Sequence, residues 1–432
     1  MPVVRLAEVV PDFNCQGAPP RLLLIAPPNS YRTVAYIKSA RRQGVDVLVA
    51  SEGKFSLVSD VAGGLHVDLS DPAALDVLLS ENRRRPFSGV VATDDSTVEL
   101  GSRVAQSLGL PHNPPSSARL SRRKDLSRQA LAAADVPVPD FRVIDLAAPA
   151  GPQLEGVALP CVVKPLALSA SRGVIRADTP AELQAACERV QAILAAEPAD
   201  DTWVNSHLLL ESFVPGPEVA VEGLLQHGVL ELLAIFDKPD PLDGPYFEET
   251  YYITPSRHAA AVQQQIVAAV KAACDGLGLR EGPVHAELRI GPAGCVILEV
   301  AARTIGGECA RLLGLGTGHS LEELVIAHAT GRPLEIVPRA GGAGVLMIPI
   351  PRAGILRRIE GLSGARAVPY IDDVLINIRD GYELVPLPEG SSYLGFMFAT
   401  APTPAEAEAA LRTAHAALNI VTAPLLRLED RR

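Results

Sequence analysis

Strand-like apolar runs alternate with helix-like segments at the start of the chain, and this restricts the fold more than any other feature. The short run 21–26 (RLLLIA) is typical of a buried parallel strand, and residues 31–43 are typical of a helix. Residues 45–50 and 89–92 have the pattern of further strands. Such alternation indicates a doubly wound parallel sheet. We therefore expect an α/β domain built on such a sheet over residues 20–115.

Length and composition indicate a multidomain globular protein. A chain of 432 residues is expected to form two to four domains of about 100–200 residues each. Hydrophobic residues make up 48% of the chain and charged residues 21%, as in ordinary soluble proteins. No apolar stretch approaches the roughly 20 residues that span a bilayer. The first residues lack the layout of a signal peptide, so no membrane association is expected.

Charge and cysteine usage narrow the class of partners. The net charge is −11 and the basic runs, 83–85 and 122–124, are brief, so nucleic acid is not favoured as a partner. The six cysteines are scattered without a CxxC pair, which favours reduced thiols in a cytoplasm over disulfides or a zinc site. Heavy use of alanine, proline and arginine suggests a bacterial source. A homodimer is expected only because dimers are the commonest soluble assembly.

Two further changes of pattern predict domain boundaries. Residues 111–115 are proline-rich, and from Gly341 onward the pattern changes to short strands. The expected domains are 1–115, 116–340 (with a mobile part at about 140–212) and a small α+β domain over 341–432. The patterns predict helices over 117–134, 180–196, 258–277, 320–330 and 403–418, and strands over 161–164, 208–211, 218–223, 346–350 and 374–378.

The segment 285–303 has the pattern of a β-hairpin that carries two glutamates. Two strands rich in Val, Ile and Leu flank a glycine-rich turn, and each contains one glutamate, Glu287 or Glu299. A loop with Gly294 in a left-handed conformation would place the glutamates opposite each other on one face. A register one residue off would send them to opposite faces. An ordinary hairpin with solvated glutamates fits this segment about equally well.

Facing carboxylates with an arginine nearby favour metal-assisted phosphoryl transfer. Two facing carboxylates repel each other unless a cation lies between them, and Mg²⁺ is a hard ion that prefers oxygen ligands. Arg303, just after the second strand, adds a forked cation suited to a phosphate. Together these groups suggest phosphoryl transfer from a nucleotide. His285 shares a strand face with Glu287 and could touch the substrate, although a packed or solvent-facing histidine fits equally well.

A second candidate site for phosphate lies at the end of the strand 161–164. Lys164 follows an apolar run, and Ser169, Ser171 and Gly173 lie in a loop of small residues that can present hydroxyls and backbone N–H groups to phosphate oxygens. Lys124, earlier in the chain, could supply a second cation. A strand-end lysine that reaches to solvent explains Lys164 at least as well. The motif GxxxxGK[ST] is absent, which excludes a P-loop.

The segment LLLESFVPGPE at 208–218 could hold a nucleoside. An apolar strand runs into Glu211, and a short linker with proline and glycine leads to Glu218. Such a linker can turn its backbone N–H and C=O groups toward an adenine edge, and the carboxylate of Glu218 can accept hydrogen bonds from ribose hydroxyls. A domain hinge with surface glutamates is the alternative.

The order of these motifs resembles that of the ATP-grasp superfamily of carboxylate–amine ligases. The similarity extends from about residue 20 to residue 335. Five pieces carry it: Lys124 ahead of DVPVP, Lys164 in CVVKP, the loop SASRG, the hinge LLLESFVPGPE, and HAEL with LEVAAR. The resemblance implies a multidomain α/β and α+β fold, in which a Rossmann-like pre-ATP-grasp domain is followed by an ATP-grasp domain and a small α+β C-terminal domain.

The resemblance also implies which residues would bind ATP. They are two lysines, three residues of the loop SASRG and four residues of the hinge: Lys124, Lys164, Ser169, Ser171, Gly173, Glu211, Phe213, Val214 and Glu218. The lysines would hold the phosphates. Glu211 and the backbone after it would read the adenine, and Glu218 would bind the ribose.

The metal and the reacting groups would be held by the hairpin region. Glu287 and Glu299 would hold two Mg²⁺ ions, for which Mn²⁺ could substitute. Arg303 would stabilise the transferred phosphoryl group and the reaction intermediate. Lys164 and His285 would be the other catalytic residues.

At one position the chain departs from the commoner pattern of the superfamily. Many members have an asparagine two residues after the second glutamate as a third metal ligand, and here that position is Ala301. The form E-x-A-A-R followed by Gly306-Gly307 is similar to that of bacterial L-amino acid ligases, which make dipeptides. The segment 247–257 (FEETYYITPSR) and the C-terminal strands also resemble that subgroup. Water or phosphate oxygens could replace the missing amide as ligands of the second metal.

The resemblance implies ATP-dependent joining of a small-molecule carboxylate to an amine through an acylphosphate, with release of ADP and phosphate. The expected product is a dipeptide of L-amino acids. Glu248, Tyr251 and Tyr252 lie in a segment that could wall the substrate pocket. One alternative is a ligase for a different acid or amine, such as a purine-pathway-like or natural-product substrate. Another is a nucleotide-binding protein without ligase activity; retention of the lysines, both glutamates and Arg303 argues against it.

Overall fold

The computed structural model describes residues 19–52, 63–197, 202–292, 294–332, 334–337 and 340–425. Contacts divide the chain into two units: the first extends to His112 and includes Ser320–Glu335, and the second holds Asn113–His319 and Ile336 onward. The helix predicted at 320–330 thus groups with the N-terminal unit. The three-domain division with boundaries at 115 and 340 stays a prediction.

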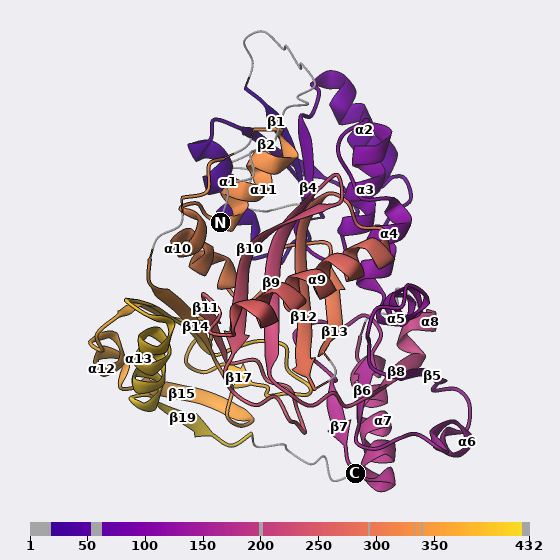
Figure 1. Ribbon diagram of the computed structural model, residues 1–432, viewed down its shortest axis with the longest axis vertical. Coiled ribbons are helices and arrows are strands. Elements are labelled where there is room, and N and C mark those ends of the chain that lie inside the picture. The colour runs from indigo at the N-terminus through magenta and orange to yellow at the C-terminus, as the bar shows by residue number, and fades with distance from the viewer. Residues whose placement is uncertain are drawn as a thin grey trace, which may run out of the picture. The chain divides into compact units, whose positions relative to one another are not determined.

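A four-stranded parallel sheet forms the first unit (Figure 1). Its strands follow the order β3-β2-β1-β4, with bounds β1 (Arg21–Ile25), β2 (Asp46–Ser51), β3 (Gly63–His66) and β4 (Gly89–Ala92). β1 is buried throughout and pairs in parallel with β2 and β4. The predicted parallel α/β arrangement is therefore confirmed. The helices of this unit are α1 (Thr33–Arg42), α2 (Ala74–Arg84), α3 (Val98–Ser107) and α11 (Leu321–Ala329).

The helix predicted at 117–134 is two helices, so that prediction is wrong at one point. α4 (Pro115–Arg122) ends where Arg123 takes an extended conformation with φ −99° and ψ 106°, and α5 (Lys124–Ala133) then begins. The Arg123 guanidinium pairs with Asp125 at 2.9 Å, which stabilises the break. As a result Lys124 is the first residue of a helix, and its backbone N–H donates to Leu166 O at 3.3 Å.

A small antiparallel sheet carries Lys164 and Glu211. Its strands follow the order β5-β8-β6-β7, with bounds β5 (Phe141–Asp145), β6 (Cys161–Pro165), β7 (Ile175–Ala177) and β8 (His207–Ser212). α7 (Pro180–Ala195) packs on it and begins with a capping box between Thr179 and Glu182. Short helices α6 (Ala150–Leu154) and α8 (Thr202–Asn205) complete this region. Val162 lies opposite Glu211, so Lys164, two residues on, shares the face of Glu211.

The largest sheet of the second unit has eight strands, all antiparallel to their neighbours. Their spatial order is β13-β12-β9-β10-β11-β14-β18-β16. Their bounds are β9 (Glu218–Gln226), β10 (Val229–Lys238), β11 (Tyr251–Thr254), β12 (Gly282–Gly291), β13 (Gly294–Ala301), β14 (Gly342–Ile348), β16 (Ile371–Ile376) and β18 (Gly395–Ala401).

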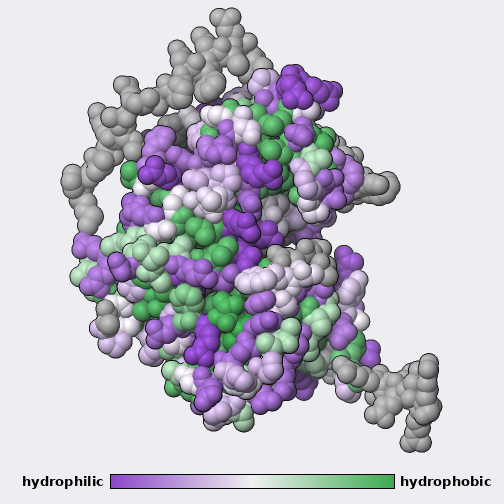
Figure 2. Space-filling model, turned by 90° about the vertical axis from the view of Figure 1, so that its right-hand side faces the viewer, coloured by the Kyte–Doolittle hydropathy of each residue, from purple (hydrophilic) through white to green (hydrophobic). Residues whose placement is uncertain are grey.

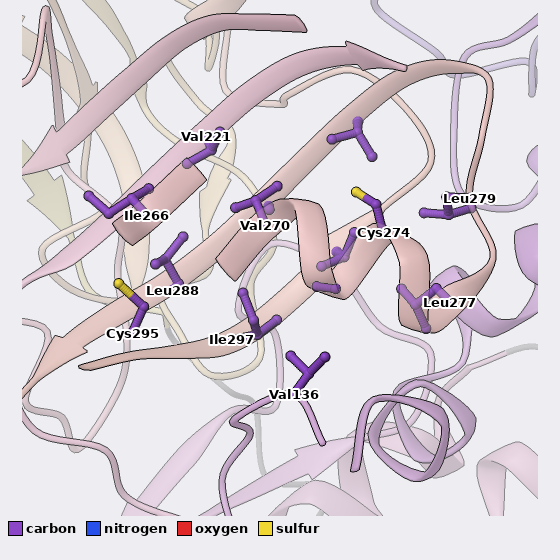
Figure 3. Close-up of a cluster of buried hydrophobic side chains, with 14 of the residues drawn as sticks. Val136, Val221, Ile266, Val270, Cys274, Leu277, Leu279, Leu288, Cys295 and Ile297 are labelled. Atoms are coloured by element: carbon purple, nitrogen blue, oxygen red, sulfur yellow. The ribbon is translucent and has the colours of Figure 1, made fainter. Parts of the chain in front are cut away.

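One face of the β13-β12-β9-β10 part of this sheet is apolar and is covered by α9 (Ala260–Leu277). Val221 of β9, Leu288 of β12 and Ile297 of β13 meet Ile266 and Val270 of α9 in a buried cluster (Figure 3). Each such side chain contributes about 1.5–3 kcal/mol on burial. Because successive strand residues point to opposite faces, the residues between these apolar ones face away from α9.

The C-terminal segment continues the large sheet and adds a small one. β14, β18 and β16 extend the eight-stranded sheet, while β17 (Glu383–Leu384), β15 (Gly354–Glu360) and β19 (Asn419–Ala423) form a separate sheet. The predicted strands at 346–350 and 374–378 start three or four residues earlier, at Gly342 and Ile371. Helices α10 (Leu313–Thr317), α12 (Leu362–Arg366) and α13 (Pro404–Ala416) complete the fold.

The surface mixes hydrophilic and hydrophobic residues. On the side shown in Figure 2, hydrophobic patches are interrupted by hydrophilic ones, as is common for folded proteins. Within the described ranges, none of the helices combines the length and the apolar character needed to cross a membrane.

Candidate active site

The two glutamates of the predicted hairpin face each other. β12 pairs with β13, and Glu287 lies directly opposite Glu299. Gly294 has a φ of +120°, so the turn uses backbone geometry that glycine permits. A bulge follows Glu287, but it leaves the two glutamates paired. The predicted register is therefore confirmed.

Strand pairing brings further charged residues onto the face of the two glutamates. Cross-strand partners share a face of a sheet. On β9, Glu218 pairs with Arg289 and Glu222 pairs with His285, while Lys238 of β10 pairs with Glu218. We call this group the charged face; it lies opposite α9 and comprises Glu218, Glu222, Lys238, His285, Glu287, Arg289 and Glu299.

Lys238 lies within the charged face, between three carboxylates. Its Nζ is 2.7 Å from Glu218 Oε1, 2.6 Å from Glu249 Oε1 and 2.9 Å from Glu287 Oε1. The side chain is 3% exposed, and Nζ also lies 4.9 Å from the ring centre of Tyr252. An ammonium carries three N–H donors, so each donor has one carboxylate acceptor.

Burial and charge act in opposite directions on the pKa values of this cluster. Burial alone would lower the pKa of Lys238, but the three carboxylates outweigh it and hold that pKa well above its usual range. Burial raises the pKa of Glu249 to about 7, although the Lys238 charge opposes the rise. Burial also opposes the charge on Glu287, yet Lys238 and His285 hold its pKa well below the usual range. Lys238 and Glu287 are therefore charged at neutral pH.

His285 lies between two carboxylates on the charged face. Its Nδ1 is 3.4 Å from Glu222 Oε2, and its Nε2 is 3.5 Å from Glu287 Oε1. Burial lowers the pKa of His285, but the two carboxylates outweigh burial and raise it to about 9. A charged imidazole cannot accept a further proton, so this geometry favours an electrostatic role over that of a general base. The predicted contact of His285 with substrate stays a prediction.

Lys164 is held by Glu211 and does not simply reach to solvent. Its Nζ lies 2.5 Å from Glu211 Oε2, and Arg128 Nε lies 2.5 Å from Glu211 Oε1. Burial would raise the pKa of Glu211, but the two cations outweigh it and lower the pKa to about 2. Both carboxylate oxygens of Glu211 are thus engaged by cations. The adenine contact predicted for Glu211 stays a prediction.

Lys124 links the region after β6 to the hairpin. Its Nζ donates to Leu168 O at 3.0 Å and lies 3.7 Å from Glu299 Oε2. The structure therefore brings one predicted phosphate lysine next to one predicted metal ligand, although 175 positions separate them in the sequence.

The predicted phosphate loop lies against the C-terminal part of the chain. Ser169 is exposed and Ser171 is half-buried. The backbone N–H of Gly173 donates to Pro388 O at 2.9 Å, so this N–H group is already engaged. Phosphate binding by this loop stays a prediction.

The predicted hinge lies against Arg289 of β12. Arg289 Nε is 2.9 Å from Glu218 Oε2, and Nη1 donates to Val214 O at 2.7 Å. The guanidinium carbon lies 5.1 Å from the ring centre of Phe213. Glu218 is buried and paired with both Arg289 and Lys238, so it is not a surface glutamate. Its predicted contact with ribose stays a prediction.

Gly216 of the hinge is expected to tolerate no side chain. Its φ is +114°, and a Cβ would lie 2.4 Å from Ile290 O. We expect Gly216→Ala to lower the free energy of unfolding by about 2–4 kcal/mol, since it adds a backbone clash to an unfavourable φ. Gly228→Ala is the matched control, because its φ is +79° but nothing lies within 4 Å of the added Cβ. Chemical denaturation measures both, and equal losses would contradict the prediction.

Arg303 lies just beyond β13 and is half-buried. Its Nη1 donates to Thr304 O at 3.1 Å. Burial raises the pKa of Glu222, and the positive charges of His285 and Arg303 partly oppose that rise. Arg303 therefore acts electrostatically on the charged face. Its predicted role toward a phosphoryl group stays a prediction.

The residues predicted to wall the substrate pocket point in different directions. Tyr252 OH lies 3.4 Å from Glu287 Oε1, at the charged face. Tyr251 OH lies 3.3 Å from His415 Nδ1, so it faces α13 instead. Glu248 Oε1 accepts a hydrogen bond from the backbone N–H of Ile350 at 3.3 Å, and burial raises the pKa of Glu248.

Four residues of the site were not predicted from the sequence: Arg128, Glu222, Lys238 and Glu249. Glu222 follows Glu218 by four residues in a strand, so a period of two places both on one face, and this signal was available. Lys238 at the end of β10 and Glu249 in the segment before β11 reach Glu287 only through the tertiary fold, which local patterns do not encode.

Family profiles match the ATP-grasp N-terminal domain over residues 37–112, the ATP-grasp domain over 157–311, and the L-amino acid ligase C-terminal domain 2 over 346–423. The crystal structure of L-amino acid ligase from Bacillus licheniformis matches with a TM-score of 0.81 and 26% identity. The match covers 94% of this chain and 100% of that one.

Two sequence relatives differ in how much of their length is matched. An uncharacterized protein of Sinorhizobium fredii is 27% identical over 408 residues, which cover 92% of this chain and 82% of that protein. Carnosine synthase 1 of Gallus gallus is 30% identical over 289 residues, which cover 62% of this chain and 31% of that protein. The chain thus spans about a third of the carnosine synthase.

The fold, the charged face and these matches define the class. The chain belongs to the ATP-grasp superfamily and is an enzyme of its ligase class. Within that superfamily it is similar to the L-amino acid ligases, both in a structural match over 94% of the chain and in the C-terminal domain at 346–423. ATP-grasp enzymes use ATP with Mg²⁺, which confirms the predicted cofactors.

The donor set of the site fits a divalent cation at the hairpin. Glu287 and Glu299 are hard oxygen donors on facing strands. Ala301, on the same strand as Glu299, is buried and offers no side-chain donor. Within the described ranges, the side chains that could form a metal cluster of three or more ligands are Glu218, Glu249 and Glu287.

Proposed function

We propose that this protein is an ATP-dependent ligase that joins two L-amino acids into a dipeptide. One observation carries the proposal: Glu287 and Glu299 face each other on the hairpin, and the Lys124 ammonium lies 3.7 Å from Glu299. This arrangement suits a metal-bound nucleotide phosphate. The similarity to an L-amino acid ligase over 94% of the chain supports the choice of amino acids as substrates.

The proposed reaction has two steps and needs no protein nucleophile. A carboxylate oxygen of the first amino acid attacks the γ-phosphorus of ATP, the bond from that phosphorus to the bridging oxygen breaks, and ADP leaves. The amine nitrogen of the second amino acid then attacks the acyl carbon of the acylphosphate. The bond from that carbon to the phosphate oxygen breaks, phosphate leaves with the electron pair, and the nitrogen loses a proton.

The side chains act mainly by positioning and by neutralising charge. Mg²⁺ held by Glu287 and Glu299 would neutralise phosphate charge. Lys124 and Lys164 attract the phosphate oxygens. Glu211 fixes the direction of Lys164, because Glu211 is itself held by a buried arginine.

Further side chains act on the transferred group and on water. Arg303 faces the negative charge that develops on the transferred phosphoryl group, and charged His285 adds to the positive potential. The loop with Ser169, Ser171 and Gly173 closes over the nucleotide and excludes water, which would otherwise hydrolyse the acylphosphate.

The test is phosphate release from ATP and Mg²⁺ by the purified protein, with amino acids offered singly and in pairs. We expect release with particular pairs, formation of ADP and not AMP, and a condensed product by mass spectrometry. Single amino acids serve as internal controls. If no amino acid or pair causes phosphate release but ATP still binds, the substrates are not amino acids. If there is neither phosphate release nor ATP binding, the proposed function is contradicted.

We expect the protein to act in a bacterial cytoplasm. Among the described cysteines, all are buried and none forms a disulfide, which is compatible with a reducing compartment. A homodimer stays an expectation from the frequency of dimers among soluble proteins.

A further inference from the structure

Lys238 has no part in the reaction steps above, although it lies within the charged face. It is the last residue of β10, and its pairing with Glu218 directs it to the side opposite α9. Its Nζ lies 2.6–2.9 Å from oxygens of Glu218, Glu249 and Glu287. The side chain is 3% exposed, so water screens these contacts little.

The three carboxylates around Lys238 form a cation site that the ammonium fills. One oxygen from each lies within 4.8 Å of the others, which is close enough for a metal ion to bind all three. Carboxylates this close repel each other strongly when buried and uncompensated. The Lys238 ammonium supplies the compensating charge, and the same Glu287 oxygen, Oε1, also lies 3.5 Å from His285 Nε2.

The hairpin offers few donors for a second metal ion. Opposite His285 on β13 lies Ala301, whose buried methyl group cannot coordinate a metal. Glu287 Oε1 already pairs with the Lys238 ammonium, and Glu299 lies near Lys124. A second divalent ion at Glu287 would have to compete with an ammonium at 2.9 Å. The positive charge that such an ion would bring is already present as Lys238.

We propose that Lys238 is a positioning residue that supplies the second cation of the site. The ammonium holds Glu287 in place toward Glu299, and the loaded enzyme carries one divalent ion beside Lys238 instead of two. The statement about the loaded enzyme rests on the proposed function. The statement that Lys238 occupies a cation site concerns the protein without nucleotide and is tested separately.

The first experiment counts bound Mn²⁺ by electron paramagnetic resonance in the presence of AMP-PNP. Wild-type protein is expected to bind one Mn²⁺ per chain. Lys238→Met removes the charge at similar length and is expected to bind two, whereas Lys238→Arg keeps the charge and is expected to bind one. Two Mn²⁺ in wild type would overturn the proposal, even if the Met variant failed to fold.

The second experiment follows thermal unfolding without nucleotide, in EDTA and in millimolar Mn²⁺. In EDTA, Lys238→Met leaves the buried carboxylate of Glu218 and the half-buried carboxylates of Glu249 and Glu287 without their cation, so its midpoint is expected to lie on the order of 10 °C below wild type. Mn²⁺ should raise the midpoint of the Met variant and leave wild type and Lys238→Arg unchanged. An equal Mn²⁺ response in all three proteins would overturn the proposal.

The two experiments separate the failure of this inference from that of the proposed function. Absence of AMP-PNP binding to wild type would count against the proposed function, while the unfolding experiment would still test Lys238. Binding of AMP-PNP together with two Mn²⁺ in wild type would retain the proposed function and reject the role of Lys238.

Discussion

Glu299→Ala is expected to lower the turnover number on the order of 10³-fold or more, while the fold stays intact. The carboxylate lies opposite Glu287 and next to Lys124, so its loss removes one of the two facing metal donors. Interactions that stabilise charge at the reacting centre typically have effects of this size. The Glu299 side chain is 33% exposed, and its neighbour Lys124 keeps a hydrogen bond to Leu168 O when Glu299 is removed.

Phosphate release with the best amino acid pair measures this effect. Glu231→Ala is the control, because Glu231 is an exposed glutamate near the start of β10, whereas Lys238 is the last residue of that strand, and Glu231 pairs with Leu224, which is not part of the charged face. The control is expected to keep wild-type turnover, and both variants should unfold in EDTA at the wild-type midpoint. Full activity of Glu299→Ala would contradict the assignment of Glu299 as a metal ligand.

Glu211→Gln is expected to lower the free energy of unfolding by about 3–5 kcal/mol at neutral pH. Glu211 is fully buried between Arg128 and Lys164, at 2.5 Å from each. Glutamine keeps the shape but leaves two cations without a negative partner, and an uncompensated buried charge is strongly destabilising. Turnover should also fall, since Lys164 loses the group that directs it.

The effect of Glu211→Gln is expected to depend on pH in a defined direction. The pKa of Glu211 is about 2 in the folded protein against 4.5 ordinarily, so its carboxylate stabilises the fold above about pH 4.5. This contribution, about 3 kcal/mol, is lost as the pH falls from 4.5 toward 2. The gap in unfolding free energy between wild type and variant should therefore narrow on acidification.

Urea unfolding at a series of pH values checks this dependence. Glu188→Gln, on the exposed face of α7, is the matched control and should differ little from wild type at any pH. If the difference in unfolding free energy between wild type and Glu211→Gln stays constant from neutral pH down to about pH 3, Glu211 does not titrate as expected.

Local patterns of apolar residues predicted strands correctly where at least one face of the strand is buried. The run 21–26 predicted a strand buried on both sides, because a parallel strand is covered by helices on each face. The hairpin prediction was confirmed down to the pairing of Glu287 with Glu299. Here the glycine-rich turn fixes the register, and each strand places its apolar residues toward α9.

Local patterns failed where one residue or one distant partner decides the structure. The helix predicted at 117–134 breaks at Arg123, because the Arg123 side chain pairs with Asp125 and the backbone turns extended. The C-terminal strands start earlier than their apolar runs, since pairing with β11 and β18 orders residues that lack a strong strand pattern.

The sequence by itself determined the buried strands β1, β2 and β4 and the facing glutamates of the hairpin, because these follow from side-chain patterns and turn residues over a few neighbours. Only the tertiary structure decided that Glu211 lies between Arg128 and Lys164, and that Lys238 fills the space between Glu218, Glu249 and Glu287. These groups come from strands and helices far apart in the chain. Their charges interact only when folding removes water and brings them within about 3 Å, and no local pattern records that distance.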